Sequence, residues 1–176
     1  MIDFSRNHFE LFGLPPRFAI DPGALDARYR HLQAEVHPDR FGAGSETERR
    51  LAHQASARVN EGYRTLRDPV ERARYLLALR GIDAMDEKDT KLPLDFLEAQ
   101  LERREHASDA AASEDLAGLQ TILAGIHREQ MARQGELAAL LDGECDAERA
   151  RLTVRELKFL AKVAEDVETM LDAIDA

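Results

Sequence analysis

The hydrophobic and polar positions of the chain repeat with the period of an α-helix, and nowhere do they alternate as in a β-strand. In residues 21–36 the apolar positions recur at spacings of four, three and four. They are Leu25, Tyr29, Leu32 and Val36. This spacing places them on one side of a helix, which Asp21 can cap and which Pro22 can open. The pattern therefore predicts an all-α protein.

Three further helices are predicted in the first half of the chain. A short helix covers roughly residues 5–12 and stops at a glycine, the residue favoured at helix C-termini. The sequence SETE at 45–48 is a capping box that opens another helix. The apolar face of that helix comprises Leu51, Ala55, Val59, Gly62 and Leu66. Asp68 and Pro69 repeat the cap-and-proline signal and start a helix that ends at Gly81.

The second half of the chain predicts three longer helices, at about residues 93–112, 113–141 and 146–174. Two of them carry clear apolar seams. The middle helix has Leu116, Leu119, Leu123 and Ile126, and the last has Leu157, Leu160, Ala164, Val167, Leu171 and Ile174. Because the connections are short, an antiparallel three-helix bundle is the simplest arrangement.

A polar segment at residues 82–91 separates these two sets of helices. Its sequence, IDAMDEKDTK, has no periodic apolar stripe. We therefore expect an N-terminal helical domain at 1–81, a linker at 82–91 and a helical bundle at 92–176.

The charge of the chain is divided unevenly between the two predicted domains. The net charge is −10, yet residues 1–81 carry 13 Lys and Arg against 11 Asp and Glu, whereas residues 82–176 carry 11 against 23. This split suggests two modules with different partners, or else acidic helices that only keep the protein in solution. The acidic half disfavours nucleic acid as a partner, because phosphate binding needs clustered positive charge.

The sequence also bears on the cellular setting. It has no apolar run near the length of about 18 residues that predicts a membrane span. The N-terminus, MIDFSRNHFELFG, lacks the basic and apolar regions of a signal peptide. Cys145 is the only cysteine, so it cannot form an internal disulfide, and its role stays open. A reducing, cytoplasmic setting without a membrane partner fits best.

Residues that could support catalysis are not arranged in familiar motifs. The sequence has no glycine-rich phosphate loop, no nucleophile elbow and no paired CxxC. The six histidines lack metal-ligand spacing, and His37 and Asp39, separated by a proline, would make a poor metal site. We therefore expect a binding protein without cofactor or metal, and not an enzyme. A metal-dependent helical enzyme is the alternative, which metal analysis of the pure protein would test.

The stretch VHPDRF, residues 36–41, ends the helix predicted at 21–36 with a stiff polar corner. Proline disfavours helical backbone in the residue before it, so His37 is the expected helix end. The outer face of this helix comprises Ala27, Arg30, His31 and Ala34, with Arg28 at its flank. Such a face is usually only solvated, but beside this corner it suggests a docking edge. Asp39 would there offer a charged hydrogen-bond acceptor.

In this helical context HPDRF resembles the J-domain of DnaJ-type co-chaperones. The flanking sequences LFGLPPRFAID and VNEGYRTLRDPVERARYLLALRGID narrow the resemblance to HscB, the J-type co-chaperone family of iron–sulfur cluster biogenesis. The resemblance runs from about Asn7 to the end of the chain and is most specific over residues 7–41 and 59–83. It implies an N-terminal J-domain, which is a helical hairpin with an HPD loop, and a C-terminal antiparallel three-helix bundle.

The resemblance implies that the J-domain engages the ATP-bound HscA chaperone and stimulates its ATP hydrolysis. The residues that would carry this role are His37, Pro38 and Asp39, with Arg28, Arg30, Arg40 and His31 supporting the docking. Arg40 stands where relatives often have lysine, a change that keeps the positive charge.

By the same resemblance, the C-terminal bundle would hold the scaffold protein IscU and deliver it to HscA. The matching positions are Leu97, Leu101, Glu102, Arg104 and Glu105 in FLEAQLERRE, and Phe159 in RELKFLAKV. Glu98 takes a position that is apolar in some relatives, so its role stays open. A J-domain co-chaperone with a different client is the alternative, and binding tests with purified IscU would separate the two.

Helical spacing and the resemblance disagree about the leucines of this segment. Leu94, Leu97 and Leu101 share one face, and spacing alone would bury them in the bundle. The resemblance instead implies an exposed apolar cluster rimmed by charge, which is typical of a protein interface. Phe159 lies off the main seam of its helix, which also favours exposure. The expectation is therefore an exposed patch.

Overall fold

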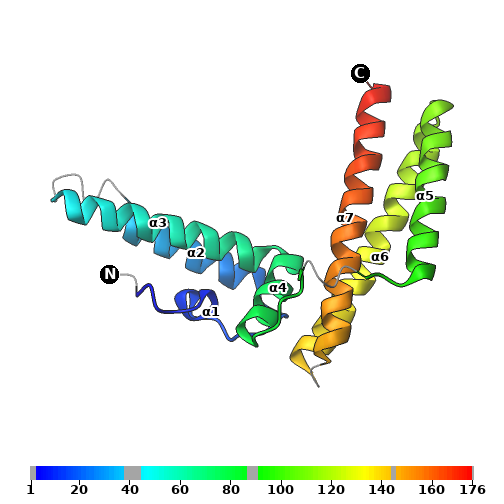
Figure 1. The fold of residues 1–176 in the computed structure, drawn as a ribbon. Coiled ribbons are helices and arrows are strands. Elements are labelled where there is room, and N and C mark those ends of the chain that lie inside the picture. Colours follow the sequence, from blue (N-terminus) through cyan, green and yellow to red (C-terminus); the bar gives the residue numbers. More distant parts are fainter. Residues whose placement is uncertain (1–2, 38–44, 87–90, 144–145, 176) are drawn as a thin grey trace. The chain divides into compact units, whose positions relative to one another are not determined.

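The described part of the chain consists of helices and their connections (Figure 1). The computed structural model describes residues 3–37, 45–86, 91–143 and 146–175. The helices are α1 (His8–Phe12), α2 (Pro22–Val36), α3 (Glu46–Arg67), α4 (Pro69–Leu79), α5 (Leu94–Ala112), α6 (Leu116–Asp142) and α7 (Ala147–Asp175). No strand occurs in these ranges, so the predicted all-α class is confirmed.

The chain forms two compact units, residues 1–76 and 77–176. The first contains α1, α2, α3 and most of α4, and the second contains α5, α6 and α7. This division falls inside α4, ahead of the boundary that the sequence led us to expect after residue 81. The predicted layout of a helical hairpin followed by a helical bundle is confirmed.

The residues that follow α4 belong to the second unit and bond to its helices. The guanidinium of Arg80 donates to the carbonyl of Leu141 at 2.9 Å. Ala84 is buried, and its carbonyl accepts a hydrogen bond from Nε of Arg155 at 3.0 Å. Part of the segment expected to be a linker therefore packs with the bundle, while the exact domain limits stay a prediction.

In the first unit, α2 and α3 form an antiparallel hairpin (Figure 1). Both begin as the sequence predicts: the Asp21 side chain accepts a hydrogen bond from the Gly23 backbone at 2.8 Å, and Ser45 and Glu48 form the capping box of α3. The core of this unit comprises Phe9, Phe12, Phe18, Leu25, Val36, Ala52, Ala55, Val59, Leu66, Ala73 and Leu76.

Helix α1 packs directly on α3 where α3 has a glycine. A Cβ atom at Gly62 would lie 2.9 Å from Cε2 of Phe12 and 3.0 Å from Nδ1 of His8. Both of these side chains are buried. Gly62 therefore allows an approach between helices that a larger residue would prevent.

In the second unit, α5, α6 and α7 lie side by side, and helices that follow one another in the chain run in opposite directions (Figure 1). The core comprises Phe96, Ala107, Ala110, Leu119, Ile126, Leu160, Val163, Ala164 and Val167. The seam predicted on α7 is buried at Leu157, Leu160 and Ala164, and Val154 and Val163, which flank this seam on opposite sides, are buried as well. Helix α7 buries a broad face because it contacts both α5 and α6.

Candidate protein-binding surfaces

The face of α2 that points away from α3 is exposed, as the sequence predicts. The exposed residues of this face are Ala27, Arg28, Arg30, His31 and Ala34. Leu25 and Val36, on the other side of the helix, are buried. Burial of the apolar stripe therefore turns the two arginines toward solvent, where positive charge can orient a partner.

Polar side chains hold α2 against α3 beside this face. The rings of Tyr29 and Tyr63 stack with their centroids 4.0 Å apart. The Tyr29 hydroxyl donates to Oδ1 of Asn60 at 2.9 Å, and the Tyr63 hydroxyl donates to Oδ1 of Asp26 at 2.8 Å. Because these contacts bridge the two helices, the arginines of α2 project from a rigid support.

Two of the basic side chains on this face have neighbours that fix their place. A Cβ atom at Gly13 would lie 3.7 Å from Nη2 of Arg28, so this guanidinium lies over the turn that ends α1. Nε2 of His31 lies 3.2 Å from Oε1 of Glu35, one helical turn further on. The exposed basic surface therefore extends from α2 toward the end of α1.

Helix α2 ends at His37, which is exposed and has φ of −58° and ψ of 128°. This non-helical ψ is expected for a residue that precedes proline. Pro38, Asp39 and Arg40 lie outside the described residues. The roles of all four residues in chaperone docking stay predictions.

Three leucines are exposed along one face of α5. Leu94, Leu97 and Leu101 are 70%, 36% and 60% exposed. Their spacing of three and four residues places them in one row, which we call the leucine stripe. The burial expected from helical spacing alone is therefore wrong, and the exposure that the resemblance implies for Leu97 and Leu101 is confirmed.

Helix α5 turns a different set of residues toward the core. These are Phe96, Gln100, Ala107 and Ala110. The ring of Phe96 meets that of Phe159 on α7 edge to face, with centroids 5.7 Å apart. Because the side chains of the two alanines are small, α5 can pack closely against its neighbours on this side, while the three leucines remain exposed on the other side. Helical spacing predicted the wrong buried face because both faces of α5 carry apolar residues.

Charged residues flank the leucine stripe. Glu102 and Glu105 are exposed, and helical geometry places them at one edge with Arg104 at the other. Nη2 of Arg104 lies 3.0 Å from Oδ2 of Asp166, and its guanidinium lies 5.3 Å from the ring centroid of Phe159. Phe159 itself is half-buried, so the exposure expected for it is only partial. The surface thus continues from α5 onto α7.

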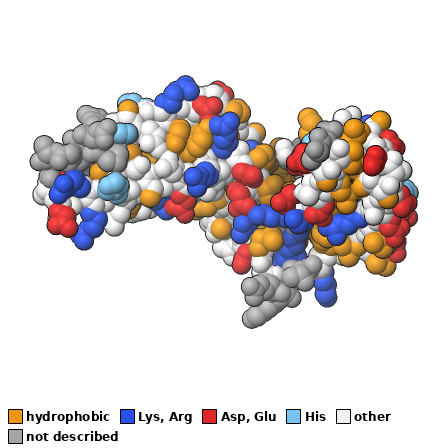
Figure 2. Space-filling model, turned by 90° about the horizontal axis from the view of Figure 1, so that it is seen from above, with side chains coloured by type: hydrophobic (Ala, Val, Ile, Leu, Met, Phe, Trp, Pro, Cys, Tyr) orange, Lys and Arg blue, Asp and Glu red, His pale blue; other side chains and the backbone are white. Residues whose placement is uncertain are grey.

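The space-filling view shows the chemical character of this unit. Over the bundle, hydrophobic side chains lie beside acidic ones on the surface (Figure 2). An exposed apolar row with a charged rim has the composition of a protein–protein interface.

The sequence pattern did not lead us to predict the buried carboxyl group of Glu156 on α7. Glu156 is 2% exposed, with its two oxygens 3.0 Å from Nη1 of Arg133 and 3.8 Å from Nη1 of Arg149. Burial raises the pKa of Glu156, although both guanidinium groups act in the opposite direction. Glu156 precedes Leu160 and Val163 at spacings of four and three, so it lies in a row of buried residues on α7. That row is the signal that could have identified it.

Glu156 belongs to a set of ion pairs around a cavity of about 340 Å³ between the three helices. Nη2 of Arg103 on α5 lies 2.8 Å from Oε2 of Glu129 on α6. Nε of Arg149 on α7 lies 2.6 Å from Oε1 of Glu136 on α6. These pairs connect all three helices, so the set supports the bundle and does not need a ligand to balance its charge.

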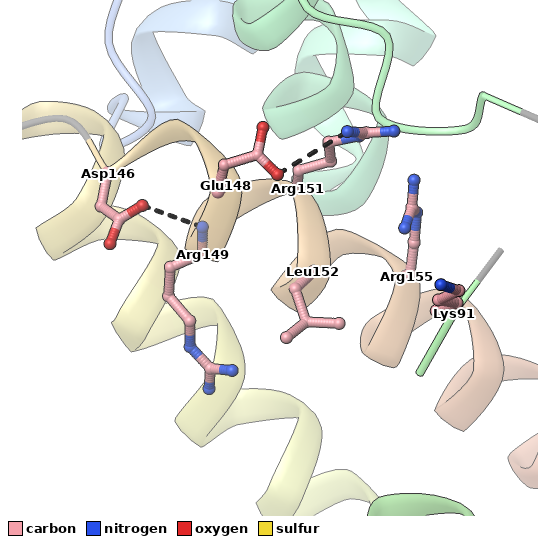
Figure 3. Close-up of a pocket in the computed structure, with 7 residues that line it drawn as sticks. All are labelled: Lys91, Asp146, Glu148, Arg149, Arg151, Leu152 and Arg155. Atoms are coloured by element: carbon pink, nitrogen blue, oxygen red, sulfur yellow. Dashed lines mark hydrogen bonds and ion pairs between the residues drawn. The ribbon is translucent and has the colours of Figure 1, made fainter. Parts of the chain in front are cut away.

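A second cavity, of about 390 Å³, lies at the start of α7 (Figure 3). Its lining residues are Lys91, Asp146, Glu148, Arg149, Arg151, Leu152 and Arg155. Arg149 points away from Arg151 and Arg155 in this view, toward its ion pair with Glu136. Arg151 pairs with Glu148 at 3.7 Å, and Arg155 donates to a backbone carbonyl. Internal bonds therefore already use these guanidinium groups, which favours a structural role for this cavity.

Two features of other protein classes do not occur in the part of the chain that the structure describes. It contains no group of three or more His, Cys, Asp or Glu residues that could hold a metal ion. It also contains no helix that is both long and apolar enough to cross a bilayer.

The hairpin with its basic face and the bundle with its leucine stripe define an all-helical protein with two surfaces suited to binding other proteins. A family model described as the HSCB C-terminal oligomerisation domain matches residues 92–168. The co-chaperone protein HscB homolog of Ralstonia nicotianae is 47% identical over 97% of each chain, and that of Burkholderia multivorans is 44% identical over 99% of each chain.

A solved structure agrees with these sequence comparisons. The chaperone HscB from Vibrio cholerae has a TM-score of 0.86 and 35% sequence identity, covering 96% of this chain and 99% of that chain. The chain belongs to the HscB family of co-chaperones, and the resemblance seen in its sequence is confirmed.

Proposed function

We propose that this co-chaperone binds the iron–sulfur scaffold IscU, delivers it to ATP-bound HscA in the cytoplasm and stimulates HscA's ATP hydrolysis, in aid of iron–sulfur cluster assembly. The observation that carries the proposal is the exposure of Leu97 and Leu101 next to Arg104 and Phe159. The bundle fills its core with other residues, so these leucines remain available to a partner.

The leucine stripe supplies the apolar part of the proposed scaffold interface. Full burial of one leucine side chain is worth about 1.5–3 kcal/mol, but association costs at least about 4 kcal/mol. Two or three leucines with a half-buried aromatic are therefore enough to support binding that is reversible, as delivery to a second protein requires. The charged rim of Glu102, Arg104 and Glu105 would set the orientation and the choice of partner.

The basic face of α2 supplies the proposed contact with HscA. Arg28 and Arg30 are exposed on a helix held by its stripe and its tyrosines, so they can attract an acidic surface on the chaperone. The HPD corner at the end of α2 would then carry the signal to the ATPase. In this proposal the protein supplies contacts, and the chemical step belongs to HscA.

The two proposed surfaces belong to separate units of one chain. A scaffold bound to the second unit is therefore tethered to whatever the first unit binds. Tethering of this kind raises the effective concentration of one partner for the other, to about the millimolar range for short connections. This gives a physical reason for joining a J-domain to a client-binding bundle.

Calorimetric titration of the protein with IscU, together with the single-turnover ATPase rate of HscA, tests the proposal. We expect saturable binding of IscU, and the largest increase in HscA's ATPase rate when IscU and this protein are both present. Stimulation of HscA without any binding of IscU would instead indicate a J-domain co-chaperone with another client.

A further inference from the structure

We propose that Asp166 on α7 is a positioning residue of the scaffold-binding surface, which acts by holding Arg104 on α5 in a binding-competent orientation. This inference rests on the proposed binding of IscU. It goes beyond the positions carried over by resemblance, because Asp166 lies outside both FLEAQLERRE and RELKFLAKV. Oδ2 of Asp166 lies 3.0 Å from Nη2 of Arg104.

Arg104 is held from two directions by α7. Its guanidinium lies 5.3 Å from the ring centroid of Phe159, and it also pairs with Asp166. Phe159 and Asp166 are seven residues apart on one helix, so they share a face two turns apart. A free arginine side chain samples many rotamers, whereas this one has a ring on one side and a carboxylate on another.

Asp166 is itself oriented by a neighbour on α7. Its Oδ1 lies 3.5 Å from Nζ of Lys162, which also lies 2.9 Å from Oε2 of Glu165. Two successive ion pairs, from Lys162 to Asp166 and from Asp166 to Arg104, therefore connect the exposed surface of α7 with that of α5. The core of the bundle fixes the two helices in turn, since Phe96 on α5 and Leu160 on α7 belong to the same hydrophobic core.

An arginine held in this way suits a particular kind of partner group. A guanidinium carries five N–H donors, and its pairing with Asp166 leaves donors for another acceptor. We expect that acceptor to be a carboxylate or a backbone carbonyl of the scaffold, at the end of the apolar contact made by Leu97 and Leu101. Because Arg104 is already ordered in the free protein, binding of the scaffold does not carry the entropic cost of ordering this side chain.

The test is IscU titration of the full-length protein with Asp166→Asn, a near-isosteric change that removes the carboxylate. We expect affinity to fall about three- to tenfold, the cost of leaving one long side chain to be ordered on binding. Glu165→Gln is the matched control, because it removes one charge at the next position and leaves the Arg104 pair intact. It should bind within about twofold of wild type.

A second comparison separates positioning from a general effect of structure or charge. With Arg104→Ala as the background, Asp166→Asn should cause no further loss of affinity, because its effect passes through Arg104. Asp166→Glu should restore part of the affinity that Asp166→Asn loses. Melting temperatures of all the variants should stay close to that of wild type, since both side chains are partly exposed.

Three results would overturn the inference while leaving the proposed function in place. They are unchanged or stronger binding by Asp166→Asn, an equal loss with and without Arg104, and a loss explained by a lower melting temperature. If the wild-type protein itself does not bind IscU, the proposed function fails, and the positioning role falls with it.

Discussion

His8 illustrates how one buried side chain can make folding depend on pH. It is buried between α1 and its neighbours, its ring centroid is 4.5 Å from that of Tyr75, and its Nδ1 has no hydrogen-bond partner. Burial lowers the pKa of His8 below the ordinary value of 6.5, and the positive charge of Arg58 lowers it further. The folded protein therefore favours the neutral form of this imidazole more than the unfolded chain does.

We predict that stability falls as the solution becomes mildly acidic. In the unfolded chain His8 takes up a proton as pH drops through about 6.5, while in the folded chain it resists protonation until lower pH. The contribution of His8 is therefore complete above pH 6.5 and is lost as pH falls from there toward the lowered pKa. Urea unfolding at about pH 7.5 and about pH 5.5 measures the difference.

A His8→Gln variant is the control for this prediction. Glutamine does not titrate, so the variant should show a smaller loss of unfolding free energy between the two pH values, whatever its absolute stability. An equal loss in both proteins would assign the dependence to other groups.

At the HPD corner we predict that Asp39→Asn leaves the fold intact and abolishes stimulation of HscA. Asparagine keeps the shape of aspartate, and if Asp39 lies in the solvated corner that the sequence predicts, such a change costs about 0.5 kcal/mol or less. It removes the charge that the proposed docking requires. Single-turnover ATPase measurements with IscU present should show no stimulation by the variant, and stimulation at the wild-type level would reject the role assigned to Asp39.

Among the helices, α5 is where stability and binding separate most clearly. We predict that Leu97→Ala with Leu101→Ala changes the free energy of unfolding by about 0.5 kcal/mol or less per residue, because both side chains are exposed. Affinity for IscU should fall at least about tenfold, since such apolar residues are the usual energetic centres of an interface. Calorimetric melting and IscU titration measure the two effects.

Leu119→Ala on α6 is the contrasting variant. Leu119 is fully buried, so its truncation should cost about 2–5 kcal/mol and lower the melting temperature. Should the double variant of α5 melt as early as this one, the leucines would be part of the core in solution. Phe159 is a mixed case, because it is half-buried against Phe96 and its loss should weaken both folding and binding.

The helices differ in how much of them the sequence could predict. The start of α3 was predictable because Ser45 and Glu48 form their capping box within four residues. The buried face of α5 was not, because the choice between Leu97 and Phe96 depends on which neighbours α6 and α7 present. Local rules decide where a helix begins, while the packing of distant helices decides which side it buries.

The polar contacts of the candidate surface could not be predicted from local sequence either. Arg104 and Asp166 are 62 residues apart, so no local pattern predicts that they pair. Leu97 and Leu101 entered the site only through the resemblance to HscB, since spacing alone would have buried them. Glu156 was identifiable in principle, as a carboxylate in a row of buried residues, but its partners on α6 and α7 required the fold.

For the whole molecule we predict that the two activities divide between two fragments. A fragment of residues 1–81 contains the first core and should stimulate HscA weakly without binding IscU, although its small core makes it marginally stable. A fragment of residues 77–176 should bind IscU and fail to stimulate HscA. Titration and ATPase measurements on both fragments test this division, and IscU binding by residues 1–81 would contradict it.

A shorter bundle fragment gives the matching control. A fragment of residues 92–176 lacks Arg80 and Ala84, which bond to Leu141 and Arg155 in the full chain. It should melt at a lower temperature than residues 77–176 and keep its affinity for IscU, because the leucine stripe is present in both.

The leucine stripe also bears on the colloidal behaviour of the protein. Apolar side chains open to water attract other copies of the same chain, and three of them lie in one row on α5. The chain's net charge of −10, concentrated in the half that carries the stripe, repels those copies before the leucines can meet. Salt screens this repulsion to within about 8 Å at physiological ionic strength, and acid removes it by protonating carboxylates. The acidic surface therefore opposes self-association through the exposed leucines, and does so most strongly at neutral pH and low ionic strength.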